Sequence, residues 1–102
     1  MIKLFSDTIK EAQLYNLKKN SKFLVIGLEV SYDEAGLKDK FKNQVIETPV
    51  SELSYAGLAV GLATQGYTPF VQFGRIEFAM LAFDQIFTQA SRWSYMFGGN
   101  YP

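Results

Sequence analysis

Glu52 is the side chain in this sequence best placed to do chemistry. It follows the turn Thr48-Pro49 and precedes a run of small residues at 56–63. Proline disfavours helical backbone in the residue before it and suits a helix entry, so a strand should end here and a helix begin. A carboxylate in a first helical turn is stabilised by about 0.3–1 kcal/mol through free N–H groups and the helix dipole. Glu52 is therefore either a helix-end charge or an acid–base group at a helix entrance.

Two glycines stand inside the helix that we expect from about Ser54 to Gln65. Gly57 and Gly61 lie one turn apart, and each costs about 0.5–1 kcal/mol relative to alanine. Glycines at this spacing permit the close approach of another backbone. That backbone can belong to a helix of the same domain or to a partner subunit, and position alone favours neither.

The composition excludes several classes of site. The 102 residues include neither cysteine nor histidine, which excludes disulfides, thiolate nucleophiles, a Ser-His-Asp triad and most zinc sites. Basic and acidic residues number 10 each, so no net charge attracts nucleic acid or an anionic membrane. No uncharged apolar segment reaches the roughly 18 residues of a membrane span, and the first residues lack a signal-peptide pattern. We therefore expect one soluble domain in the cytoplasm.

Three short apolar runs predict the strands of a parallel sheet. Residues 23–26 are continuously apolar, which is typical of a strand covered on both faces, and two more strands are expected at 45–47 and 70–73. In open parallel sheets ligands gather beyond the carboxyl ends of the strands. We expect one crevice at this edge, bordered by Gly27, Thr48 and Gly74.

Helices should connect and cover these strands. Four are predicted, at about 6–20, within 31–43, at 54–65 and at 76–97. In the last helix, apolar residues recur at spacings of three and four, which favours a face packed in the core: Ala79, Phe83, Ile86, Ala90, Trp93 and Phe97. The fold class is therefore α/β, a partial three-layer domain with a short, mostly parallel sheet flanked by helices. The open edge of a three-stranded sheet favours a truncated domain.

The pattern around Glu52 resembles a known family. Glu52, Gly57, Leu58 and Gly61 form E-x4-G-Φ-x-x-G, which resembles the signature of the pyrimidine-binding domain of thiamin-diphosphate enzymes. More narrowly, the chain resembles the N-terminal portion of the beta subunit of the decarboxylating component of 2-oxo acid dehydrogenase complexes. The matching sequence segments are Thr48-Pro49-Val50-Ser51-Glu52, Gly66-Tyr67-Thr68-Pro69, Phe78-Ala79-Met80, Asp84-Gln85-Ile86 and Tyr95-Met96-Phe97-Gly98-Gly99. Residues 1–102 would then be the N-terminal part of a pyrimidine-binding domain.

The resemblance implies a catalytic role for Glu52. In the family this glutamate hydrogen-bonds N1′ of the cofactor's aminopyrimidine ring and promotes proton transfer. Phe78 matches an aromatic residue that contacts the ring, and Val50 and Gly74 are expected to border the same cofactor site.

Two further positions can be compared with the family. Gly57 and Gly61 would lie at a subunit interface. Leu28 stands where the family has the first acid of a loop near the cofactor, whereas Glu29 keeps the second acid. This departure weakens the case for a proton relay through the loop.

The resemblance also implies that the cofactor is shared between subunits. The family holds the diphosphate and its magnesium with a Gly-Asp-Gly motif on another domain, and this sequence has no such motif. The chain would bind only the aminopyrimidine half of thiamin diphosphate, would hold no metal and would be inactive alone. The implied partners are an alpha subunit, a second beta subunit and the lipoyl acyltransferase component. The reaction would be oxidative decarboxylation of pyruvate or a branched-chain 2-oxo acid.

Two other functions remain open. The middle domain of a transketolase or deoxyxylulose-phosphate synthase shares the glutamate and the glycine-containing helix. The sequence segments at 84–86 and 95–99 nevertheless favour the dehydrogenase group. A non-catalytic dimerisation module could also keep the glycine helix, with Glu52 as a helix-end charge. Leu28 and the short chain favour that module. Thiamin-dependent activity in the presence of an alpha subunit would separate these functions.

Overall fold

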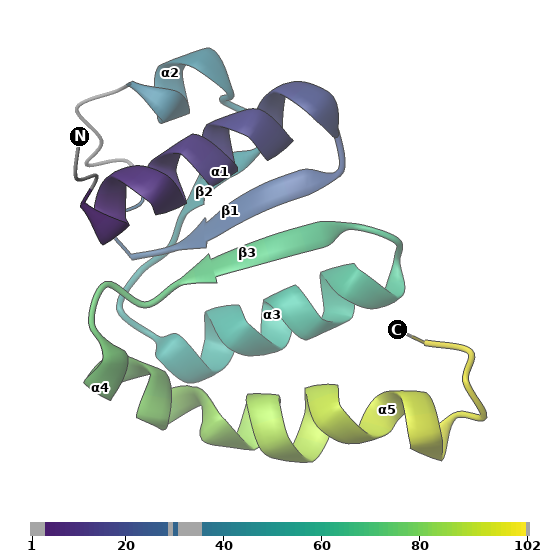
Figure 1. The fold of residues 1–102 in the computed structure, drawn as a ribbon. Coiled ribbons are helices and arrows are strands. Elements are labelled where there is room, and N and C mark those ends of the chain that lie inside the picture. Colours follow the sequence, from purple (N-terminus) through teal and green to yellow (C-terminus); the bar gives the residue numbers. More distant parts are fainter. Residues whose placement is uncertain (1–3, 29, 31–35, 102) are drawn as a thin grey trace.

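The computed structural model describes residues 4–28, 30 and 36–101. In this part of the chain one sheet has the strand order β2-β1-β3 (Figure 1). The strands are β1 (Phe23–Gly27), β2 (Val45–Glu47) and β3 (Thr68–Gln72). Both outer strands run parallel to β1, which confirms the predicted parallel sheet.

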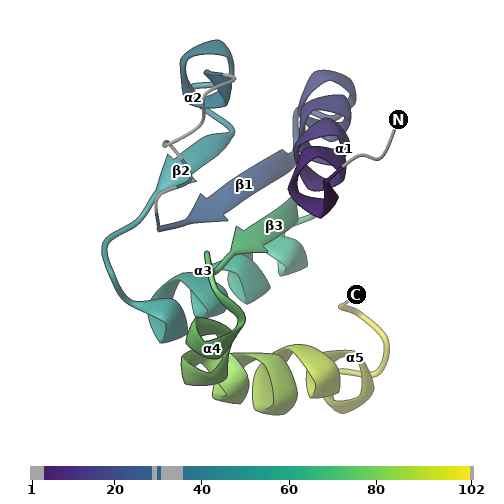
Figure 2. The ribbon, with the colours of Figure 1, turned by 60° about the vertical axis from the view of Figure 1, so that its left-hand side comes forward.

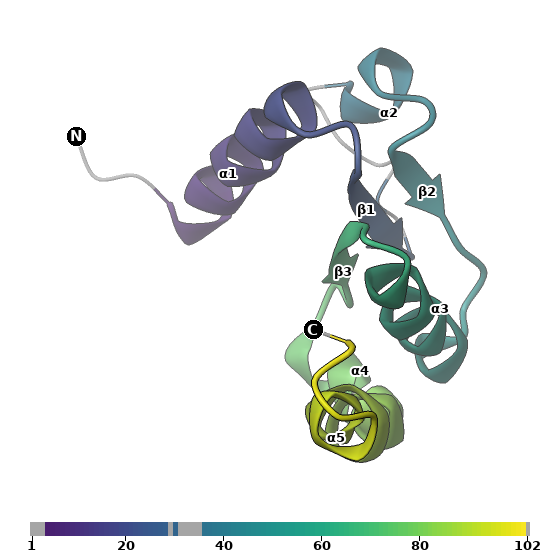
Figure 3. The same ribbon diagram turned by 90° about the vertical axis from the view of Figure 1, so that its right-hand side faces the viewer.

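Helices cover both faces of the sheet. The helices α1 (Phe5–Lys19) and α2 (Leu37–Lys40) belong to one face and α3 (Glu52–Thr64) to the other. Figure 3 shows α1 and α3 on opposite sides of the strands. This arrangement confirms the predicted α/β fold with a short sheet flanked by helices.

Strand β1 supplies side chains to both cores because successive residues of a strand point to opposite faces. Phe23 and Val25 pack with Leu17 in a cluster that also includes Val30, Leu37 and Val45. Leu24 and Ile26 pack with Tyr55 of α3. Ile26 has no exposed surface, as expected for a strand covered on both faces.

The helical segment after β3 is not uniform. It consists of α4 (Ile76–Ala79), the 3₁₀ turn η1 (Met80–Ala82), the π-helix η2 (Asp84–Ala90) and α5 (Ser91–Met96). The segment runs beside α3 (Figure 2). The prediction of one helix over 76–97 is therefore correct in extent, but it is wrong in regularity.

The predicted core face of this segment is also partly wrong. Phe83 is 44% exposed and Phe97 is 46% exposed, whereas Ala82 is fully buried. A π-helix has more residues per turn than an α-helix, so the apolar stripe changes direction along the segment. Ala82 is the buried residue of this segment among those described, and several of the larger side chains remain at the surface.

Helix α3 begins two residues earlier than predicted. The carbonyl oxygen of Ser51 accepts hydrogen bonds from the backbone N–H groups of Ser54 and Tyr55, each at 3.1 Å. These bonds bring Glu52 into the first turn of the helix. Of the helix predicted within 31–43, only Leu37–Lys40 is helical among the described residues. Residues 31–35 and Glu29 lie outside the described part of the chain.

Candidate functional site

The carboxyl ends of the three strands meet at one edge of the sheet. Gly27 ends β1 and is in register with Glu47 of β2 and Gln72 of β3. The backbone N–H of Thr48 donates to the carbonyl oxygen of Gly27 at 3.0 Å. The segments that follow the strands therefore leave the sheet from neighbouring positions, as the sequence predicted.

The expected crevice is divided between the two faces of the sheet. Thr48 lines a cavity of about 160 Å³ at the start of α3. Gly74 lines a different cavity of about 380 Å³, which α1 borders through Gln13 and other residues. Gln13 is buried and its Nε2 donates to Oε1 of Gln72 at 3.2 Å. Because α3 and α1 cover opposite faces, Thr48 and Gly74 border separate spaces rather than one shared crevice.

Glu52 is a buried carboxyl group at the entrance of α3. It is the first residue of the helix and only 6% exposed. Within the described residues it forms no salt bridge with a lysine or arginine. The helix dipole and the free N–H groups of the first turn favour a negative charge at this position. A buried carboxyl group without a salt bridge in the described part of the chain is a candidate for an acid–base role.

Two hydroxyl groups near the start of α3 lack hydrogen-bond partners. Tyr55 is 2% exposed, and its ring packs against that of Phe73 with a centroid distance of 5.6 Å. The hydroxyl groups of Tyr55 and Thr48 are buried and unpaired within the described structure. Unpaired buried polar groups are rare in folded proteins and each calls for an explanation.

The electrostatic environment links Tyr55 to Glu52. Burial raises the pKa of Tyr55 above its ordinary value of 10.0, and the negative charge of Glu52 raises it further. Tyr55 was not among the predicted site residues. Its spacing of three residues from Glu52 was the available signal, because residues three apart share a helix face.

The other predicted cofactor residues lie in the connections that follow β2 and β3. Val50 is 73% exposed between β2 and α3. Gly74 has a positive φ of 73° and precedes α4. Phe78 lies in α4 and is half-buried, with the guanidinium carbon of Arg75 at 5.2 Å from its ring centroid. These residues leave the sheet at the same edge as Glu52, but no cavity that we describe is lined by both connections.

The two helix glycines have different surroundings. A Cβ atom on Gly57 would lie 3.0 Å from Oε1 of Gln85, so the segment after β3 approaches α3 closely at this point. A Cβ atom on Gly61 would meet nothing within 4 Å. The neighbour of Gly57 is therefore in the same chain, whereas the space beside Gly61 is open.

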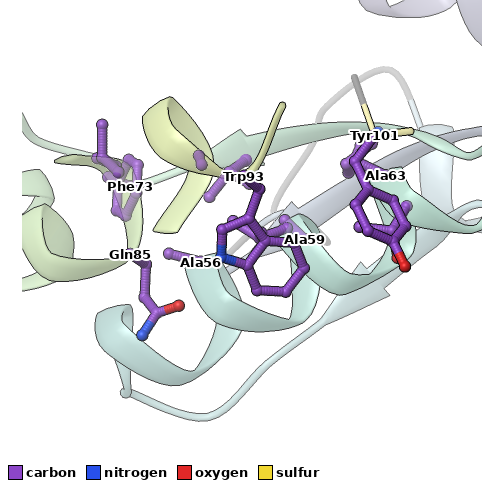
Figure 4. A pocket seen from close by; sticks show the side chains of 13 residues that line it. Ala56, Ala59, Ala63, Phe73, Gln85, Trp93 and Tyr101 are labelled. Atoms are coloured by element: carbon purple, nitrogen blue, oxygen red, sulfur yellow. The ribbon is translucent and has the colours of Figure 1, made fainter. Parts of the chain in front are cut away.

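A third cavity, of about 240 Å³, lies between α3, β3 and the segment after β3. Figure 4 shows Trp93 and Tyr101 beside the alanines of α3. Nε1 of Trp93 donates to Oε1 of Gln89 at 2.9 Å. None of the predicted site residues lines this space. Sequence reasoning missed the cavity because it depends on how the irregular segment packs against α3.

Metal-binding clusters and membrane-spanning helices are both absent from the described residues. Among residues 4–28, 30 and 36–101, no group of three or more Asp or Glu side chains could hold a metal ion. In the same part of the chain no helix is long and apolar enough to cross a membrane.

Comparison with known proteins identifies the family. Residues 6–98 match the family model described as transketolase, pyrimidine binding domain. The chain is 40% identical over 103 aligned positions to the mitochondrial pyruvate dehydrogenase E1 component subunit beta of Chaetomium thermophilum, covering 94% of this chain and 27% of that protein. It is also 40% identical over 100 positions to the pyruvate dehydrogenase E1 component subunit beta of Rickettsia conorii, covering 91% of this chain and 31% of the relative.

A relative named for another substrate also matches. The mitochondrial 2-oxoisovalerate dehydrogenase subunit beta of Dictyostelium discoideum is 36% identical over 91 positions, covering 83% of this chain and 25% of that protein. The chain thus spans between a quarter and a third of the length of these relatives. The family model covers nearly the whole chain, and the α/β fold agrees with the fold that the resemblance implied. The chain belongs to the transketolase pyrimidine-binding domain family.

Proposed function

We propose that this chain is the pyrimidine-binding part of a thiamin-diphosphate-dependent 2-oxo acid dehydrogenase beta subunit. In this role residues 1–102 form the N-terminal part of the domain and contribute to oxidative decarboxylation of pyruvate or a branched-chain 2-oxo acid. The observation that carries the proposal is the buried Glu52 at the first turn of α3. The names of the pyruvate and 2-oxoisovalerate dehydrogenase relatives support both substrate classes.

The groups at the start of α3 fit a polar aromatic ring. When bound, thiamin diphosphate supplies an electron sink for decarboxylation of a 2-oxo acid. Glu52 would hydrogen-bond N1′ of the aminopyrimidine and exchange a proton at that atom. Phe78 would contact the ring and Val50 would border it. Gly74, predicted for the same site, lines a different cavity from Thr48. The unpaired hydroxyl groups of Tyr55 and Thr48 leave hydrogen-bonding capacity at the start of α3, which is consistent with a polar ligand.

The remaining half of the cofactor would be held by a partner. The sequence has no Gly-Asp-Gly motif, so an alpha subunit would bind the diphosphate and its magnesium. The same assembly would include a second beta subunit and deliver its product to the lipoyl acyltransferase component. We propose a cytoplasmic location, although several relatives are named as mitochondrial.

The surface of the chain supports assembly with other subunits. The segment after β3 exposes large apolar side chains, among them Ile76 (85%), Met80 (63%) and Phe87 (59%). On α3, Leu58 is 48% exposed, and the space beside Gly61 is open. Exposed apolar patches of this kind mark interaction sites in soluble proteins. We assign Gly61 to the subunit interface; Gly57, predicted for the same role, already lies against Gln85 of the same chain.

The test is the substitution Glu52→Gln in the full protein assembled with an alpha subunit. Loss of the ionisable group should lower the rate of 2-oxo acid decarboxylation by about 10²-fold or more, with assembly unchanged. Asp39→Asn is the matched acid-to-amide control, because Asp39 is exposed on α2. Comparing the decarboxylation rates with pyruvate and with branched-chain 2-oxo acids would identify the preferred substrate.

Two results would contradict the proposal. An assembled wild type without thiamin-dependent activity would exclude the dehydrogenase role. A Glu52→Gln variant as active as wild type would exclude the proton-transfer role of the carboxyl group. Either outcome would favour a non-catalytic interaction module in which Glu52 is a helix-end charge.

A further inference from the structure

The hydroxyl group of Tyr55 has no structural task in the described fold. The aromatic ring of Tyr55 makes the packing contacts of this side chain, with Leu24, Ile26 and Phe73. A phenylalanine would fill the same space and bring no polar atom into the core. The hydroxyl instead remains buried without a hydrogen bond, an arrangement that is unfavourable unless some state of the protein supplies a partner.

Glu52 and Tyr55 lie three residues apart in the first turn of α3. Side chains three residues apart lie on one helix face, and long side chains lean toward the N-terminus of the helix. A tyrosine with this lean would bring its hydroxyl group toward the turn that carries Glu52. The effect of the Glu52 charge on the pKa of Tyr55 is consistent with this proximity.

Thr48 provides a second hydroxyl group at the same place. Thr48 and Tyr55 line the same cavity of about 160 Å³ at the start of α3. Both hydroxyl groups are buried and unpaired. A hydroxyl can donate one hydrogen bond and accept others, so the Thr48 hydroxyl can donate to the Tyr55 oxygen while Tyr55 donates to a carboxylate.

We propose that Tyr55 is a positioning residue for Glu52. In the state with ligand bound, its hydroxyl group donates a hydrogen bond to the Glu52 carboxyl group, and the hydroxyl of Thr48 donates to Tyr55. The chain of bonds would fix the carboxyl group at the angle that the aminopyrimidine ring requires. This inference rests on the proposed function, because it assigns new residues to the same site.

The test compares Tyr55→Phe and Thr48→Val with wild type in the full protein assembled with an alpha subunit. Binding of thiamin diphosphate with magnesium is measured by calorimetry, and the melting temperature is measured without ligand. Tyr55→Phe should weaken binding about tenfold or more, because a hydrogen bond to a charged group is lost. Thr48→Val should weaken binding less. Tyr67→Phe is the matched control, since Tyr67 is 39% exposed in the turn after α3.

A spectroscopic measurement distinguishes positioning from a merely structural role. The infrared band of the Glu52 carboxyl group is the band lost in Glu52→Gln. In the ligand-bound protein it should shift in Tyr55→Phe and stay unchanged in Tyr67→Phe. The melting temperature of ligand-free Tyr55→Phe should equal or exceed that of wild type, since the substitution removes a buried unpaired group.

The outcomes separate this inference from the proposed function. If wild type binds thiamin diphosphate and Tyr55→Phe binds it equally well, the positioning role is wrong and the proposed function stands. If Tyr55→Phe loses affinity only together with melting temperature, and the Glu52 band does not shift, the positioning role is also wrong. If wild type does not bind the cofactor, the proposed function fails and this inference fails with it.

Discussion

The backbone carbonyl oxygen of Gln72 occupies the space that a side chain on Gly27 would need. The two residues are in register at the carboxyl ends of β3 and β1, and a Cβ atom on Gly27 would collide with that oxygen. Gly27 also has a positive φ of 155°, which residues with a Cβ rarely adopt. Glycine at position 27 therefore allows the ends of β1 and β3 to approach closely.

We expect Gly27→Ala to destabilise the protein by about 2 kcal/mol or more. The added methyl group must displace the backbone of Gln72 and also imposes an unfavourable φ. Chemical denaturation measures the change in the free energy of unfolding. Gly36→Ala is the control, because Gly36 has a positive φ of 64° but nothing lies within 4 Å of a Cβ there. A cost in Gly27→Ala no larger than that in Gly36→Ala would contradict the contact with Gln72 as the reason for glycine at position 27.

We expect Gly61→Ala to have opposite effects on folding and on assembly. Alanine in a helix is favoured over glycine by about 0.5–1 kcal/mol, and the space beside Gly61 is open, so the isolated chain should become more stable. If a second subunit packs its backbone on Gly61, the same methyl group should weaken assembly. Denaturation and analytical ultracentrifugation measure the two effects. A variant that assembles as tightly as wild type would contradict the interface role of Gly61.

The sequence was sufficient to predict the sheet and the position of Glu52. Residues 23–26 are apolar without interruption because β1 is the central strand and both of its faces are covered. The Pro49 turn and the glycine spacing placed Glu52 at a helix entrance. These features depend on local periodicity and turn chemistry, which a single sequence displays directly.

Tertiary packing determined what the sequence could not predict. The irregular turns η1 and η2 place Ala82 in the core and leave Phe83 exposed, although the regular spacing favoured Phe83 as a core residue. The unpaired hydroxyl of Tyr55 likewise depends on how α3 sits on the sheet. Neither feature has a signature in residue spacing alone.

We expect the stability of the chain to fall above about pH 10 because of Tyr55. Its pKa is raised in the folded state, so the unfolded state loses this proton first as the pH rises. The contribution of Tyr55 to the free energy of unfolding is therefore fully present below pH 10.0, the ordinary pKa. This contribution is lost as the pH rises through the folded-state pKa. Tyr55→Phe should remove this part of the loss, whereas Tyr95→Phe should not, because Tyr95 is 92% exposed. Denaturation at neutral and alkaline pH measures the difference.

The same titration tests the link between Tyr55 and Glu52. Burial is the larger cause of the raised pKa and the charge of Glu52 the smaller. Glu52→Gln removes the charge and keeps the burial, so Tyr55 should ionise at a lower pH than in wild type but above the ordinary value. Ultraviolet absorbance follows the phenolate, with Tyr55→Phe as the blank. An unchanged titration in Glu52→Gln would show that the two side chains are not coupled.

Substitutions at Ile26 and Ile76 distinguish the stability of the core from assembly at the proposed interface. Ile26 has no exposed surface, whereas Ile76 is 85% exposed at the start of α4. Ile26→Ala should cost about 2–5 kcal/mol of unfolding free energy, since it leaves a cavity between the sheet and α3. Ile76→Ala should change the isolated chain by no more than about 0.5 kcal/mol. If partner subunits cover α4, Ile76→Ala should weaken assembly while the isolated chain unfolds as wild type does. Unchanged assembly would place the interface elsewhere on the surface.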